Sequence, residues 1–194
     1  MPTIHNPSFY IAHTDSAASM RLTNQLKHYF NALQPSRRII IVCVGTDRCT
    51  GDSLGPLSGT LLSKYRSNSF DLYGTLENPI HAMNLDETIE RIYTTNIDPF
   101  VIAIDACLGR AASIGTIHII DGPLRPGAGV NKQLTPVGDI HISGIVNVGG
   151  LLGYQVLQNT RLHLIMSMAN MISRSLFVAI SISGKEDHEQ LGAK

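Results

Sequence analysis

A run of six apolar residues, Ile39 to Val44, places the strongest constraint on how this chain can fold. The run is too short for a buried helix, and its continuous, mostly β-branched character is typical of a strand buried on both faces of a parallel sheet. A glycine-rich turn that carries Asp47 and Asp52 comes directly after it, within VGTDRCTGDSLGP. The sequence therefore predicts a central strand whose carboxyl end opens into an acid-bearing loop.

A second apolar run, Phe100 to Ile104, also ends in an acid, Asp105. Ligands of open α/β sheets bind outside the carboxyl ends of the strands, so Asp52 and Asp105 predict a site at that edge. A carboxylate at the end of a buried strand is costly unless it is paired, protonated or bound to a metal. The structural alternatives are that Asp52 caps the next helix and that Asp105 accepts backbone N–H groups from the loop after the strand.

Helical and extended patterns alternate along the chain, which predicts an α/β fold: a three-layer α/β/α sandwich with a mostly parallel central sheet. Helices are expected at 15–33, 54–65, 84–93 and 147–157, and strands at 39–44, 70–76, 99–105, 115–121 and 139–143. Residues 161–166 form either a last strand before a helix or the first part of one long helix. We expect an N-terminal arm and helix (1–37) packed on a domain (38–183), with a polar tail (184–194) after it. The long connection 122–138 is expected to be a lid or a substrate rim.

The composition narrows the classes of function. The chain has 194 residues, 43% of them hydrophobic, and a formal net charge of +0, which suits one globular domain and gives no basis for binding nucleic acid or an anionic membrane. No run of about 18 apolar residues and no secretory signal is evident, so we expect a cytoplasmic protein. Cys43, Cys49 and Cys107 have neither disulfide nor zinc-site spacing.

Several further residues are candidates for supporting roles. Gly51 and Gly55 suit a tight turn packed closely against other backbone. Ser53 and Ser143 lack the GxSxG context of a hydrolase nucleophile. His141, in DIHISGIVN, is either a structural histidine or a metal ligand. Two carboxylates and an imidazole would suit a divalent ion, so Asp52, Asp105 and His141 form an alternative metal site. Cys49 and Cys107 are either small buried residues or, with His141 as base, a nucleophile.

Three segments together carry a resemblance to a known family: VGTDRCTGDSLGP, IDACLG and HISGIVNVGG. They resemble the YyaC family of sporulation proteins, which carry the label of spore proteases. The resemblance covers about residues 38–177. That family is similar in turn to germination proteases and hydrogenase maturation endopeptidases, and this kinship implies a phosphorylase/hydrolase-like fold.

The resemblance also implies roles for single residues. Asp52, in GDSLGP, and Asp105, in a DAL-like segment, match the two catalytic acids of germination protease. With His141 they also match the three residues that touch the substrate's nickel in the maturation enzymes, although those enzymes have Glu where this chain has Asp52. Asp47, Gly51, Ser53, Gly55, His141 and Ser143 are then expected to support the site or bind substrate.

The implied function is an atypical aspartic peptidase that needs no cofactor and cleaves a protein or peptide, such as a spore protein, in the forespore or spore interior. The resemblance leaves open whether the protein forms an oligomer. Two alternatives stand beside this function. One is a metal-dependent hydrolase or maturation-type endopeptidase built on Asp52, Asp105 and His141. The other is a non-catalytic binding protein on the same fold.

Overall fold

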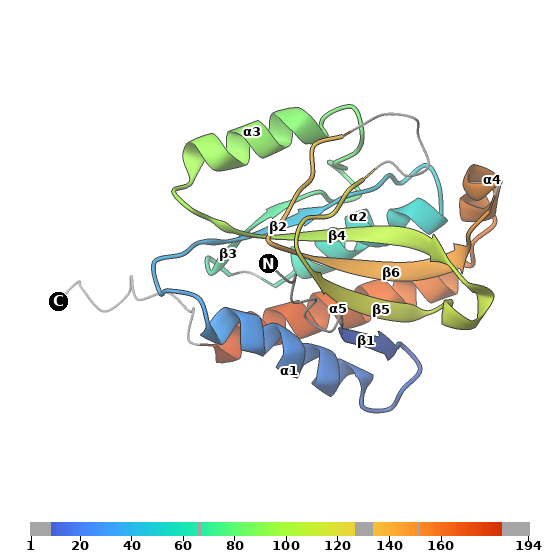
Figure 1. Cartoon of the computed structure of the whole chain (residues 1–194), viewed down its shortest axis with the longest axis horizontal. Coiled ribbons are helices and arrows are strands. Elements are labelled where there is room, and N and C mark those ends of the chain that lie inside the picture. Colours follow the sequence, from blue (N-terminus) through green and yellow to red (C-terminus); the bar gives the residue numbers. More distant parts are fainter. Residues whose placement is uncertain (1–8, 66, 127–133, 151, 184–194) are drawn as a thin grey trace, which may run out of the picture.

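The computed structural model describes residues 9–65, 67–126, 134–150 and 152–183. Their centre is a six-stranded sheet in the order β1-β5-β6-β4-β2-β3 (Figure 1). The strands are β1 (Phe9–Ala12), β2 (Ile39–Cys43), β3 (Phe70–Tyr73), β4 (Phe100–Gly109), β5 (Thr116–Asp121) and β6 (Ile140–Val148). The helices are α1 (Ala18–Asn31), α2 (Leu54–Leu62), α3 (Leu85–Thr95), α4 (Gly153–Gln158) and α5 (Leu162–Ile182), with short 3-10 turns η1 (Gly51–Ser53) and η2 (Ala111–Ser113).

The sheet is mostly parallel, as the alternating pattern predicted. β3, β2, β4 and β6 run parallel to one another, whereas β5 is antiparallel to both β6 and β1. All five residues of β2 are buried, which explains why its sequence is apolar without alternation. The expected α/β class is therefore confirmed.

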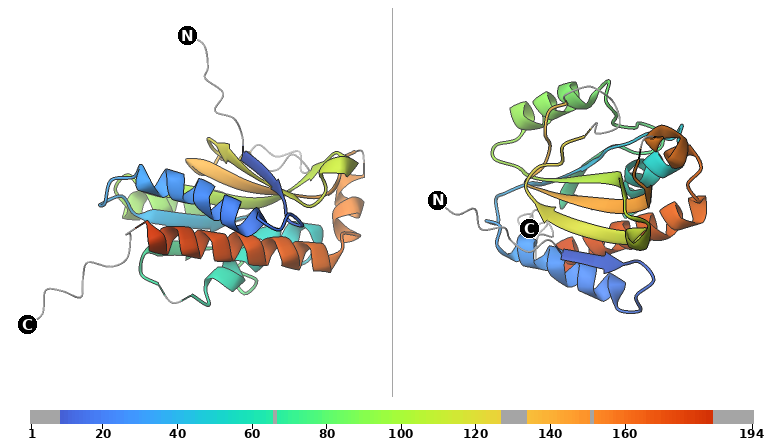
Figure 2. Two further views of the ribbon diagram at one scale, coloured as in Figure 1. Left: turned by 90° about the horizontal axis from the view of Figure 1, so that it is seen from below. Right: turned by 45° about the vertical axis from the view of Figure 1, so that its right-hand side comes forward.

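Helices cover both faces of the sheet (Figures 1 and 2). On one face, α1, α2 and α5 contribute Leu26, Leu54 and Ile172 to a large apolar core with alternate residues of the strands. On the other face, α3 packs Leu85, Ile89 and Ile92 onto β2 and the first half of β4. Since α1 packs in the main core with α2 and α5, it belongs to one of the two helical layers of this three-layer sandwich.

The structure differs from the sequence expectation at the chain's amino end and around β6. Residues 9–12 form an edge strand beside β5, where an arm was expected. The expected strand at 139–143 extends to Val148, and the helix expected from Asn147 begins only at Gly153. Two glycines, Gly149 and Gly150, disfavour a helix at its predicted start, so the chain stays extended beside β4 instead.

The expectation of a last strand at 161–166 is wrong, and the alternative of one long helix, α5, is confirmed. The buried residues Ile165, Met168, Ile172 and Leu176 recur every three or four positions, which is the period of a helix. α5 is also long and apolar enough to cross a membrane, with a mean hydropathy of 1.5 over its 18-residue window, contrary to our expectation of no such run. Half of that window is buried, and α5 packs against α1 and α2 as a core helix.

Two expectations fall wholly or partly outside the described residues. The tail 184–194 is not described, and neither are residues 127–133 of the connection expected to act as a lid. The described ends of that connection meet in an antiparallel bridge between Leu124 and Val137, beside α3 and the buried face of β4.

Candidate active site at the end of the parallel strands

The strand order reverses between β2 and β4. From β2 the chain runs through α2 to β3 on one side, then crosses the opposite face through α3 and returns to β4 on the other side of β2. In open α/β sheets such a reversal opens a crevice outside the carboxyl ends of the two strands, and ligands bind there. Asp52 lies in the turn after β2, and Asp105 lies one residue beyond the last β2–β4 pair, Cys43 with Ile104.

Close backbone contacts fix the turn that carries Asp52. The Thr46 N–H donates to the Asp52 carbonyl over 3.1 Å, so the turn closes on itself. Gly55 packs directly on the Val44 carbonyl, and a Cβ atom there would overlap it. A Cβ atom on Gly51 would stand 2.8 Å from the hydroxyl oxygen of Thr160. The predicted close approach at these two glycines is therefore present, and it sets the position of Asp52.

Asp105 has a carboxylate held next to its own backbone. Its Oδ1 accepts the Ala106 N–H over 2.8 Å, so the structural role that we weighed for Asp105 is present. Burial raises the pKa of Asp105 well above its usual range, the charge of Asp52 raises it further, and the Ala106 hydrogen bond opposes both effects. Burial also raises the pKa of Asp52. The structure therefore brings the two acids into one electrostatic environment.

Neither acid is neutralised by a cation in the described part of the chain: the ion pairs there involve other aspartates. Helix capping does not account for Asp52 either, because α2 begins after Ser53 and has no side-chain cap. Two partly buried carboxylates without a counter-ion disfavour double ionisation, so the pair retains a proton at pH values where an exposed pair would lose both. Such a pair presents one acid and one base at the same pH.

The neighbouring strand β6 carries His141 and Ser143. Ser143 is the register partner of Asp105, is 7% exposed, and therefore lies directly beside the acid. His141 pairs with Ala103, two positions before Asp105, and its Nδ1 donates to the Gly122 carbonyl over 2.9 Å. Within residues 9–65, 67–126, 134–150 and 152–183, no three His, Cys, Asp or Glu side chains gather closely enough to hold a metal ion. The described geometry therefore does not fit the alternative site of Asp52, Asp105 and His141.

The other candidates occupy different places around the turn. Ser53 is buried and donates its hydroxyl to the Thr50 carbonyl over 2.7 Å, which commits it to the turn. Asp47 is exposed at the tip of the turn. Burial and the charge of Asp105 raise the pKa of Cys107 to about 11, so its thiol resists ionisation and suits the role of a nucleophile poorly.

Sequence reasoning missed a group of hydrogen bonds that joins the end of β6 to α4 and to Thr160 after it. The Asn147 side-chain amide donates to the Val156 carbonyl over 3.1 Å and to the Thr160 hydroxyl over 3.2 Å. Thr160 in turn packs on Gly51, next to Asp52. Beside these hydrogen bonds is an open cavity of ≈ 290 Å³, lined by Asn147, Val148, Leu152, Gln155, Val156 and Asn159. The NVGG segment was the available signal, but it was assigned to the start of a helix.

The fold is an α/β sandwich, and a hydrogenase maturation protease of known structure has the same class of fold. The structure matches a [NiFe] hydrogenase maturation protease, HycI from Thermococcus kodakarensis KOD1, with a TM-score of 0.55 and 20% identity, covering 80% of this chain and 97% of that one. At this identity the match shows a common fold and nothing more.

The sequence comparisons identify the family. The chain belongs to the family described as "Protein of unknown function (DUF1256)", whose sequence model matches residues 10–175. It is 51% identical over 167 residues to the uncharacterized protein YyaC of Bacillus subtilis (strain 168), covering 86% of this chain and 81% of that protein. The resemblance to the YyaC family is therefore confirmed.

Proposed function

We propose that this protein is a peptidase in which Asp52 and Asp105 hydrolyse a peptide bond of a protein or peptide substrate. The observation that carries the proposal is the pair of partly buried acids at the switch point, where the charge of Asp52 raises the pKa of Asp105. Groups with strongly perturbed pKa values in a crevice are candidates for acid–base catalysis. The fold shared with a maturation protease supports the same class of reaction.

The two acids take different roles in this proposal. Asp105, whose pKa is raised the more, keeps the proton, and Asp52 is the carboxylate. Asp52 accepts a proton from a water molecule as the water oxygen bonds to the substrate carbonyl carbon. Asp105 then gives its proton to the departing nitrogen as the C–N bond breaks, and the proton on Asp52 passes to Asp105 to restore the starting state.

Backbone N–H groups of the turn from Gly45 to Gly51 are the candidates to stabilise the developing oxyanion. Two of them are already committed within the protein, because Gly45 donates to the Ile80 carbonyl and Thr46 to the Asp52 carbonyl. The N–H groups of Arg48 and Asp52 also have partners, the Thr46 hydroxyl and the Cys49 carbonyl. The role therefore falls to the remaining amides of the turn, from Cys49 to Gly51.

Membership of the YyaC family suggests the setting for this activity. We propose a spore protein as the substrate and the cytoplasm of the forespore or spore as the compartment. The proposed proton transfers use the two carboxyl groups and need no metal. A binding protein that keeps the fold without turnover is the competing function, and a cleavage assay separates the two.

The test uses proteins extracted from Bacillus subtilis spores, with new amino termini counted by mass spectrometry. The unmodified protein should generate new termini, and Asp52→Asn and Asp105→Asn should each reduce their rate of formation by about 10²–10⁴-fold, the usual contribution of a general acid or base. Asp98→Asn is the matched control, because this acid lies at the other end of β4 with its side chain 80% exposed. Cleavage by either active-site variant at the unmodified rate would refute the assignment, and a substrate captured intact would favour the binding protein.

A further inference from the structure

β4 continues past the end of its neighbour β2. β4 has ten residues and β2 has five, and their pairing stops at Cys43 and Ile104 (Figure 1). The last hydrogen bond on this side runs from the Val44 N–H to the Ile104 carbonyl over 2.7 Å. From Asp105 to Gly109, β4 pairs with β6 alone. One side of this segment therefore faces the space outside the carboxyl end of β2, beside the acid pair, which we call the crevice.

The backbone groups on that side can be identified from the alternation of a strand. The Ile104 carbonyl points toward β2, whereas the Gly109 carbonyl accepts the Gly149 N–H on the β6 side. N–H and C=O groups of alternate residues point the same way, so those of Ala106 and Leu108 face the crevice. The Ala106 N–H is taken by Asp105. The Ala106 carbonyl and both backbone groups of Leu108 point away from β6, the strand that pairs with this part of β4, and the pairing with β2 ends before them.

These three groups, the Ala106 carbonyl and the Leu108 N–H and carbonyl, form what we call the free edge of β4. Both residues are only partly buried, so an incoming chain can approach them. An exposed row of strand donors and acceptors is a template for pairing with another extended chain. The free edge begins one residue after Asp105, which joins it directly to the acid pair.

We propose that the substrate binds as an added β-strand on the free edge of β4, beyond the end of β2, with its scissile bond against Asp52 and Asp105. This inference rests on the proposed function and adds the substrate class: an extended, unstructured segment of a protein, recognised chiefly through its backbone. Val44, Gly45 and their contacts with Ile80 border the crevice opposite β4, so the free edge accepts a single chain. Since only alternate residues of an added strand face β4, the substrate must offer free N–H groups at every second position.

The test measures peptide binding without cleavage. A library of unstructured ten-residue peptides is selected against the Asp52→Asn variant, and the tightest binder is resynthesised with one N-methyl group at each position in turn. Strand addition predicts that affinity falls about tenfold at alternate positions only, near the value of one backbone hydrogen bond. Equal losses at consecutive positions, no loss at any position, or failure to select any peptide would overturn the inference.

A matched pair of variants tests the protein side of the same contact. Leu108→Pro removes the N–H that faces the crevice and leaves the β6 ladder intact, whereas Leu108→Ala shortens the side chain and keeps the N–H. The proline variant should bind the selected peptide about tenfold more weakly, and the alanine variant should bind within about twofold of the parent. Equal losses in both variants would assign the contact to the side chain and overturn strand addition. If the proline variant does not fold, the N-methyl scan decides alone.

The peptide-binding measurements and the cleavage test of the proposed function can fail independently of each other. Binding with the alternating pattern, in a protein whose Asp52→Asn and Asp105→Asn variants still cleave at the full rate, would retain strand addition and remove the acids from the mechanism. Cleavage that depends on both acids, without the alternating pattern, would retain the peptidase and remove the added strand.

Discussion

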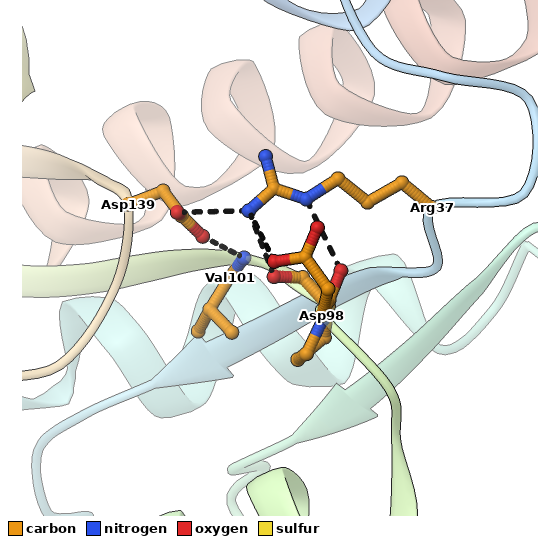
Figure 3. A network of polar contacts seen from close by, with 5 residues as sticks. Arg37, Asp98, Val101 and Asp139 are labelled. Atoms are coloured by element: carbon orange, nitrogen blue, oxygen red, sulfur yellow. Dashed lines mark hydrogen bonds and ion pairs between the residues drawn. The ribbon is translucent and has the colours of Figure 1, made fainter.

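β4 has a cluster of aspartates at each end, and the two clusters are built in opposite ways. At its amino end, Asp98 and Asp139 both contact the guanidinium of Arg37 (Figure 3). At its carboxyl end, Asp52 and Asp105 lie near each other, and no ion pair in the described part of the chain includes either of them. The aspartates at the amino end of the strand are thus stabilised by a cation. Those at the carboxyl end lose part of their contact with water and have no cation among the described residues to offset that cost.

The amino-end cluster ties the starts of several strands together. Arg37 Nη2 lies 3.2 Å from Asp139 and 3.3 Å from Asp98, and its guanidinium lies 5.4 Å from the centre of the Phe100 ring. The second oxygen of Asp139 accepts the Val101 N–H over 2.7 Å. Each residue that Figure 3 labels therefore has at least one polar partner, which is the arrangement of a structural cluster.

The carboxyl-end cluster lacks that compensation. Burial raises the pKa of both acids, and the only charge that acts strongly on Asp105 is the like charge of Asp52. Such an arrangement lowers stability at neutral pH, and a fold retains it where the protonation states are useful. The difference between the two ends is what separates an acid that fastens strands from an acid that is available for chemistry.

The largest effect on stability should come from a substitution in the amino-end cluster, where Arg37 offsets the charge of the aspartates. In Asp139→Asn the amide cannot accept from both Arg37 and Val101, so we expect the free energy of unfolding to fall by about 1–3 kcal/mol. Urea denaturation measures the change. Asp98→Asn is the control, because the side chain of Asp98 is 80% exposed and its ion pair should contribute at most about 1 kcal/mol.

Cleavage by the folded fraction of Asp139→Asn should equal that of the unmodified protein, since Asp139 lies at the far end of β4 from the acid pair. Unchanged stability in this variant would show that the amino-end cluster does not fasten the strands. A specific loss of turnover, with the fold intact, would remove the contrast between the two ends.

A smaller effect on stability, of opposite sign, should come from a substitution in the carboxyl-end cluster of Asp52 and Asp105. Asp105→Asn removes a partly buried carboxylate that has no counter-ion in the described part of the chain, so we expect the free energy of unfolding at neutral pH to rise by about 1 kcal/mol, a usual size for one substitution. The pKa of Asp105 is higher in the folded than in the unfolded state, so the folded protein binds more protons and stability falls as pH rises between those two pKa values. The advantage of the variant should therefore be absent below about pH 4 and grow as the pH rises.

Denaturation curves at several pH values check this prediction. Asp139→Asn, measured in parallel, should be less stable than the unmodified protein at neutral pH, where Asp105→Asn is more stable. If Asp105→Asn were destabilising at neutral pH, the buried carboxylate of Asp105 would have a compensating partner, and the contrast between the two ends of β4 would be lost.

The sequence alone predicted the acid pair because its signals are local. The runs Ile39–Val44 and Phe100–Ile104 identify two strands, and the residues at the carboxyl ends of parallel strands lie at one edge of a sheet. The family resemblance placed Ser143 near the site, and the glycines of the turn are where a close backbone approach requires them.

Features that depend on pairing between distant segments were beyond the sequence. The length of β6, and with it the place of Asn147, is set by hydrogen bonding to β4 rather than by local preference. His141 lies two positions short of Asp105 because of strand register, which composition does not encode. The free edge of β4 exists only because β4 is longer than β2, and the contacts of Arg37 join residues about 60 and 100 positions apart along the chain.

The most direct test of the paired acids is a titration of the aspartate side chains by carbon-13 NMR, in the unmodified protein and in Asp52→Asn. We predict that the Asp105 carboxyl titrates well above the value of about 3.9 of a free aspartate. In Asp52→Asn its midpoint should fall, though not to the free value, because burial remains. A midpoint for Asp105 near the free value, or one that does not move when Asp52 is replaced, would contradict the claim that the two acids form one site.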